Sequence, residues 1–123
     1  MAAQTDFWGE IEVIGGPTPL SILREQAALL GTKTQNLIEA KVETYGAEGG
    51  TLHHSFRLVV PALDRYTYEL FSISHSVLEP YPIVLPSRIV LENEDKFKDW
   101  LPKKLSSPET KEILGNLISQ ARS

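Results

Sequence analysis

The sequence predicts a single α+β domain in which helices pack on an antiparallel sheet. Apolar residues recur at helical spacing after residue 18 and again after residue 93, and they alternate with polar residues between positions 38 and 75. The length of 123 residues, with 41% hydrophobic side chains, is typical of one domain. We therefore expect an N-terminal arm at residues 1–16 and a single domain at residues 17–123.

The arm carries a bulky apolar pair, Phe7 and Trp8, followed by an alternating stretch. Ile11 and Val13 alternate with glutamates, which is the period of a short strand. We expect this arm to dock on the domain.

The first helix is marked by its two ends. Thr18 is a suitable N-cap, Pro19 suits the first helical position because its missing N–H has no partner there, and Gly31 is a plausible stop. The apolar stripe between them consists of Leu20, Leu23, Ala27 and Leu30.

Three strands follow as an antiparallel meander. Apolar residues alternate from residue 38 to 42, from 52 to 60 and from 66 to 75. Glycines at 46–50 and the segment 62–65 provide the turns.

Prolines then interrupt the strand pattern. Pro80, Pro82 and Pro86 prevent a normal central strand and favour a rigid extended turn, after which the apolar run 89–91 can add a fourth strand. The expected sheet has three to four strands.

Two helices complete the chain. Glu92 or Asn93 can open the first, Phe97, Trp100 and Leu101 mark its buried side, and Pro102 should kink or end it. Ser107 followed by a proline begins the last helix.

Charge and composition exclude several function classes. Sixteen acidic against twelve basic residues give a net charge of −4, which disfavours nucleic acid as a partner. No apolar stretch could span a membrane and no signal peptide is recognisable, so we expect a cytoplasmic protein without membrane contact. The absence of cysteine excludes disulfides and thiol nucleophiles, and we expect no cofactor and no metal.

Residues Tyr81, Pro82 and Pro86 form a YPxxxP segment directly after the third strand. In that position the segment resembles the turn of the ubiquitin-conjugating-enzyme-like superfamily, and specifically its RWD branch, over roughly residues 18–122. The resemblance implies helix, four-stranded meander, turn and helices, with the Tyr81 ring over the sheet edge and its hydroxyl bonded to backbone.

Catalytic members of that superfamily use a cysteine and a His-Pro-Asn segment. This chain has no cysteine, and residues 87–93 contain neither the histidine nor the proline. The resemblance therefore implies a non-catalytic domain that binds another protein, as a monomer or homodimer. Tyr45, Tyr66 and Tyr68 are the predicted partner contacts, because aromatic side chains on a sheet suit an interface.

The histidines support a second hypothesis, a small enzyme or ligand-binding protein with a pocket between sheet and helices that uses His54 or His75. Neighbouring residues on a strand point to opposite faces, so His53 and His54 should not share one site. The serines that alternate around His75 lack the strained turn and partner acid of a hydrolase. A third hypothesis, an immunity or chaperone-like protein that neutralises one partner, rests on small size and acidic charge alone.

Overall fold

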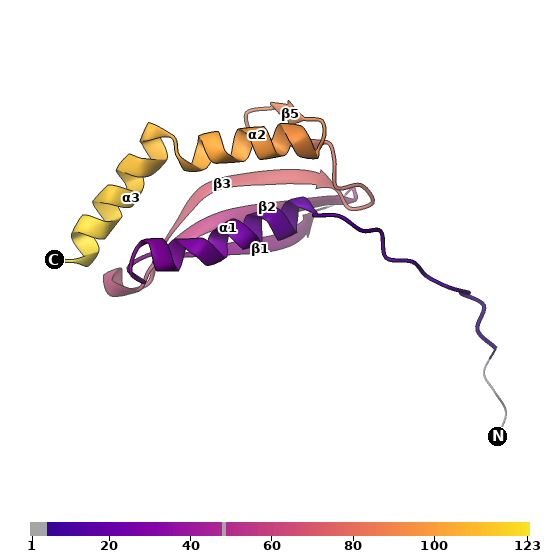
Figure 1. Ribbon diagram of the computed structural model, residues 1–123, viewed down its shortest axis with the longest axis horizontal. Coiled ribbons are helices and arrows are strands. Elements are labelled where there is room, and N and C mark those ends of the chain that lie inside the picture. The colour runs from indigo at the N-terminus through magenta and orange to yellow at the C-terminus, as the bar shows by residue number, and fades with distance from the viewer. Residues whose placement is uncertain (1–4, 48) are drawn as a thin grey trace, which may run out of the picture.

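The computed structural model describes residues 5–47 and 49–123 and confirms the α+β class. Helix α1 precedes a five-stranded antiparallel sheet in the order β1-β2-β3-β4-β5, and α2 and α3 follow it (Figure 1). The strands are β1 (Glu39–Ala47), β2 (Thr51–Val60), β3 (Tyr66–Ser76), β4 (Ile83–Val84) and β5 (Val90–Leu91). Within the described residues no helix is long and apolar enough to cross a membrane.

Helix α1 (Pro19–Lys33) begins as its sequence predicts. The Thr18 hydroxyl accepts the Ser21 N–H, and the Ser21 hydroxyl accepts the Thr18 N–H, which forms a capping box. The prediction that Gly31 ends the helix is wrong, because the helix continues to Lys33. Thr34 is the C-cap of the helix. Its hydroxyl donates to the Leu30 carbonyl and accepts the N–H of the buried Ile38.

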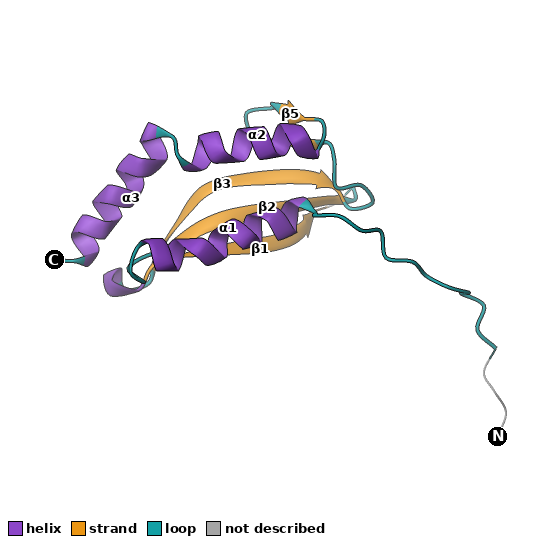
Figure 2. Ribbon diagram, in the orientation of Figure 1, coloured by secondary structure: helices purple, strands orange, loops and turns teal. Residues whose placement is uncertain are grey.

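The long strands β1, β2 and β3 form the meander that the alternation predicts (Figure 2). Between β2 and β3 the chain makes a single 3-10 turn, Pro61–Leu63, and reverses at Asp64 and Arg65, both with positive φ. The pairing of β2 with β3 shifts register between Phe56 and Arg57. This irregularity lets both Leu70 and Phe71 pack against the core, although they are neighbours on one strand.

The sheet has five strands rather than three or four. Ile83–Val84, inside the proline-rich segment, is strand β4: it pairs with Ser74 of β3 on one side and with β5 on the other. Proline lacks an N–H, but Pro82 and Pro86 flank these two residues and leave their own backbone groups free to pair. The short run that was expected as the fourth strand is therefore the fifth.

The expected hydrogen bond of the Tyr81 hydroxyl is absent. The Tyr81 ring packs partly buried against the core, but its hydroxyl is buried with no hydrogen-bond partner among the described residues. Burial, together with the nearby Glu94 carboxylate, raises the pKa of Tyr81 to about 12.

Helices α2 (Glu94–Leu105) and α3 (Pro108–Ala121) start at the predicted caps, Asn93 and Ser107. The sequence predicts that Pro102 kinks or ends the helix. It does not end the helix, because α2 continues for three residues beyond it. A proline removes one N–H from a helix, and the bond from the Ser106 N–H to the Pro102 carbonyl keeps the last turn closed.

All three helices pack on the same face of the sheet. The core joins Leu23 of α1, Leu58 and Ile73 of the sheet, Phe97 of α2 and Leu117 of α3. The opposite face of β1 to β3 carries mostly polar side chains.

The expectation of a docked arm with a short strand is also wrong for this chain. Residues 5–16 form no strand and extend away from the start of α1 (Figure 1). Phe7 and Trp8 are 92% and 82% exposed, and none of the buried core residues comes from this segment.

Candidate functional site

Two histidines that are far apart in the sequence meet on the helix-covered face of the sheet. His54 of β2 lies opposite Ile73, and His75 of β3 lies opposite Leu52, so the two rings are diagonal neighbours. Their Nε2 atoms are 2.8 Å apart, and the two side chains are 1% and 8% exposed. The structure therefore unites the two residues that the second hypothesis named separately.

Hydrogen bonds fix the protons of this pair. His75 Nδ1 lies 2.8 Å from the Ser76 carbonyl oxygen and 3.2 Å from that of Glu79, and carbonyls only accept, so Nδ1 carries a proton. In the neutral His75 ring Nε2 then accepts from His54 Nε2–H. The His54 Nδ1 accepts in turn from the Thr44 hydroxyl, 2.9 Å away. This directed chain satisfies all four ring nitrogens.

Burial, and then the nearby charges of His75, Arg24 and His53, lower the pKa of His54 to about 4. The pair can accept one proton by reversing its central hydrogen bond. Two added protons would set two N–H groups against each other at 2.8 Å. Near pH 7 the lowered pKa therefore favours the neutral form of His54.

The pair lines a cavity of about 370 Å³ at the root of the arm. Its other walls come from residues 14–18, from Leu20 and Leu52, and from Val77, Leu78 and Pro80. His53 lies on the opposite face, as parity predicts, and stacks on Tyr45 with ring centres 5.6 Å apart. In the described parts of the chain no three histidine or acidic side chains converge as metal ligands.

The serines beside His75 do not form a hydrolase pair with it, because their hydroxyls bond to backbone groups. The Ser74 hydroxyl donates to the Val84 carbonyl, and the Ser76 hydroxyl accepts the Leu78 N–H. No described serine hydroxyl bonds to either ring of the pair.

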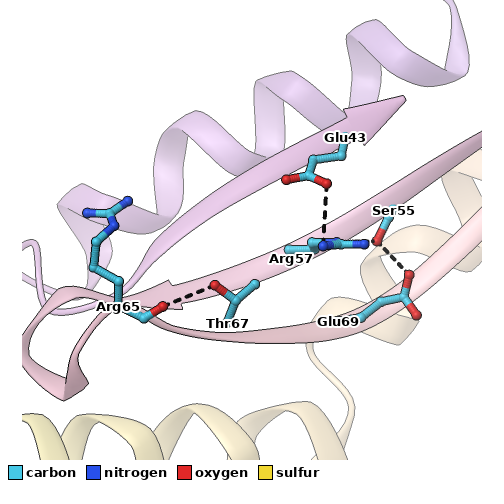
Figure 3. Close-up of polar contacts among 6 residues, drawn as sticks. All are labelled: Glu43, Ser55, Arg57, Arg65, Thr67 and Glu69. Carbon is cyan, nitrogen blue, oxygen red and sulfur yellow. Dashed lines mark hydrogen bonds and ion pairs between the residues drawn. The ribbon is translucent and has the colours of Figure 1, made fainter. Parts of the chain in front are cut away.

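A second polar cluster crosses β1, β2 and β3 on the opposite face (Figure 3). The Ser55 hydroxyl donates to Glu69 and accepts from Arg57 Nε, and the Arg57 guanidinium pairs with Glu43 at 3.4 Å. Ser55 is fully buried beneath these side chains, so a substrate cannot reach its hydroxyl. We interpret this cluster as cross-strand stabilisation.

The three predicted contact tyrosines do not form one surface. Tyr45 lies on the polar face with His53, whereas Tyr66 and Tyr68 lie opposite Val60 and Leu58 on the helix-covered face. Tyr68 packs partly against the core. A joint contact role for the three is not supported by this placement.

The structure also has an apolar groove that the sequence analysis missed. It is a hollow of about 310 Å³ between α1 and the junction of α2 with α3. Its lining is mostly apolar, with Leu29 and Leu30 from α1, Phe56, Leu58 and Leu70 from the sheet, and Leu105 and Leu114 from the C-terminal helices. We call this hollow, with its continuation described next, the α1 groove.

A second hollow of about 570 Å³ continues the first along α1. The two share Gln26, Leu105 and Ser106, and the second reaches Pro17 at the root of the arm. The α1 groove therefore runs beside α1 from the arm root to the far end of the helix, where Lys33 and Lys111 line it. Neither lysine forms an ion pair with a carboxylate of the described residues.

A sequence signal for the groove does exist. Leu29 lies outside the stripe that faces the core and is 47% exposed, and Leu70 precedes Phe71 in a strand whose faces otherwise alternate. Such extra apolar residues mark surface that the fold leaves partly uncovered.

Comparison with known proteins gives no relative: no protein family, no curated protein and no solved structure matches this chain.

Proposed function

We propose that this chain is a non-catalytic protein-binding domain of the RWD type, and that the α1 groove holds an apolar segment of the partner. The observation that carries the proposal is the groove itself, an apolar channel beside α1 with two lysines at one end. Interfaces combine an apolar centre with a polar rim, and each large apolar side chain that is buried contributes ~1.5–3 kcal/mol.

The resemblance of the Tyr81 to Pro86 segment to the RWD turn supports the same proposal, as does the order of helix, meander and C-terminal helices. A thioester mechanism has no nucleophile, because the chain has no cysteine. We place this binding function in the cytoplasm, as the sequence predicts.

A peptide-display selection on the full chain tests the proposal. We expect the wild-type chain to enrich peptides that contain large apolar residues with acidic neighbours, and the variant Leu29→Glu to lose them at least tenfold. Leu29 is half-exposed and lines the groove, so the substitution adds a negative charge there without removing a core residue.

Ile89→Glu is the matched control, because Ile89 is exposed to a similar extent, 53% against 47% for Leu29, and lies outside the groove. It should retain the selected peptides with unchanged affinity. Failure to enrich any peptide, or equal binding by Leu29→Glu and wild type, would refute the proposal.

The histidine pair favours a second candidate function, the binding of a small ligand that accepts or donates one proton. Its supporting observation is the position of His54 and His75 on the wall of the 370 Å³ cavity. Side-chain nitrogen NMR during a screen of small acids and amines tests it. Ligand-dependent shifts at His54 and His75, with none at His53, would support this candidate, whereas unchanged ring nitrogens with every compound would exclude it.

A further inference from the structure

We infer that the α1 groove is occupied by the N-terminal arm of a second copy of this chain, so that two copies form a homodimer by exchanging arms. The inference rests on the proposed function of the groove and names its partner.

The arm has the chemistry of a segment that is buried in its working state. Its five large apolar side chains, Phe7, Trp8, Ile11, Val13 and Ile14, are all more than three-quarters exposed. Several large apolar side chains exposed together on a folded domain mark an interaction site. Within one copy, the described structure offers these side chains no contact with the core.

Arm and groove are complementary in polarity and in charge. The hollow of about 310 Å³ at one end of the groove is lined mainly by leucine and phenylalanine side chains, which suit the apolar residues of the arm. Its continuation along α1 is more polar, with Glu25, Gln26 and Lys98 in its lining. Among residues 5–16 the charged side chains are Asp6, Glu10 and Glu12, all acidic. Lys33 and Lys111 at the groove supply the opposite charge, and neither pairs with a carboxylate among residues 5–47 and 49–123.

The arm is also long enough to cover the groove. Twelve extended residues, 5–16, span roughly 40 Å, and the 15 residues of α1 span roughly 22 Å. The arm can therefore follow the groove from end to end.

The direction in which the arm leaves the start of α1 favours docking in the groove of another copy over docking in the groove of its own chain. Pro17 and Pro19 restrict their own φ angles, and Thr18 between them is extended, with ψ at 161°. The arm consequently leaves α1 pointing away from the molecule (Figure 1). Docking into its own groove would require a full reversal at Gly15 and Gly16, whereas the partner's groove can receive the arm in its extended form.

A two-fold arrangement then forms the contact twice, because each copy contributes one arm and one groove. This symmetry gives a direct experiment by sedimentation velocity on the full chain. Two variants are used: Phe7→Ser with Trp8→Ser, which weakens the arm, and Leu29→Glu, which blocks the groove. Each alone should raise the dissociation constant of the dimer at least tenfold, and Ile89→Glu should not.

A mixture of the arm variant and the groove variant provides the decisive control. One copy keeps an intact groove and the other an intact arm, so the mixture should form a heterodimer more tightly than either variant dimerises alone. A mixture that stays as monomeric as its components would overturn arm exchange.

The absence of native cysteines allows a second readout. In the double variant Ile11→Cys with Lys111→Cys, oxidation should link the arm of one chain to the groove of another and yield a species of twice the mass. An internal link in a monomer would show that the arm folds back on its own chain and would overturn the inference.

The two proposals fail separately. A wild-type chain that is monomeric at millimolar concentration overturns arm exchange, while peptide selection through Leu29 can still succeed. Failure of the selection refutes the binding of partner segments in the groove, and a dimer that Leu29→Glu does not weaken refutes the groove as the site of arm exchange.

Discussion

At the residue scale, His54 links the stability of the fold to pH. In the folded chain its pKa is lowered to about 4, whereas in the unfolded chain it returns to its ordinary value of 6.5. The unfolded state therefore binds a proton first as pH falls. Well above pH 6.5 the His54 imidazole does not lower the free energy of unfolding. Between pH 6.5 and pH 4 it lowers the free energy of unfolding increasingly as the pH falls.

We predict that the wild-type chain loses about 2 kcal/mol more free energy of unfolding between about pH 7 and about pH 4.5 than the variant His54→Gln does. Urea unfolding at the two pH values measures the difference. His53→Gln is the control and should follow the wild type. An equal loss in wild type and His54→Gln would show that His54 is not held neutral by its surroundings.

Tyr81 gives a second prediction at this scale. Its hydroxyl is buried without a described partner, so Tyr81→Phe should leave the free energy of unfolding unchanged or raise it by up to about 1 kcal/mol. Tyr81→Ala should lower it by about 2 kcal/mol or more, because the ring packs against the core. Thermal melts of the two variants beside wild type measure these changes. Tyr45→Phe is the control, because Tyr45 is exposed. A loss above about 1 kcal/mol in Tyr81→Phe would mean that the hydroxyl is bonded after all.

At the element scale, Pro102 is poorly suited to its position. It lies inside α2, where it leaves the Lys98 carbonyl without the usual N–H four residues later. We predict that Pro102→Ala stabilises the chain by about 1 kcal/mol or more, measured as a rise in melting temperature. Lys103→Ala is the control: this next residue along the chain is exposed, so its substitution should change the melting temperature little. A lower melting temperature in Pro102→Ala would contradict this account of α2.

The long elements could be predicted from the sequence because local chemistry decides them. The caps Thr18, Asn93 and Ser107 set the helix starts, and alternation set the three long strands. The missed strand depends on distant partners, because Ile83–Val84 pairs with Ser74 of β3 and with β5. The error at Pro102 is local, because the bond from the Ser106 N–H to the Pro102 carbonyl keeps the last turn of α2 closed.

For the candidate sites, too, local features could be predicted from the sequence and contacts between distant residues could not. Strand parity correctly separated His53 from His54, but parity cannot show that His75 lies diagonal to His54 until the strand register is known. The α1 groove depends on the angle between α1 and the C-terminal helices, which no local pattern specifies. The composition of the arm predicts docking, and we propose that it docks on a second copy.

At the scale of the whole molecule, the fold places its two candidate sites on either side of the arm root. The histidine cavity and the α1 groove share Pro17 in their linings. Filling the groove with an apolar segment would therefore bring the occupant next to the wall of the histidine cavity. We predict that binding in the groove lowers the solvent exchange of the amides at residues 14–18, which hydrogen exchange with and without a selected peptide measures.

We propose the α1 groove as the surface on which this chain binds apolar segments. The most direct test is an amide NMR titration of the labelled variant Phe7→Ser with Trp8→Ser, whose own arm is weakened, using a synthetic peptide of residues 5–16. We predict that the largest shifts fall on Leu29, Lys33 and Leu114, and that Leu29→Glu abolishes them. Shifts confined to the polar face of the sheet or to the histidine cavity, or no shifts at millimolar peptide, would contradict the claim.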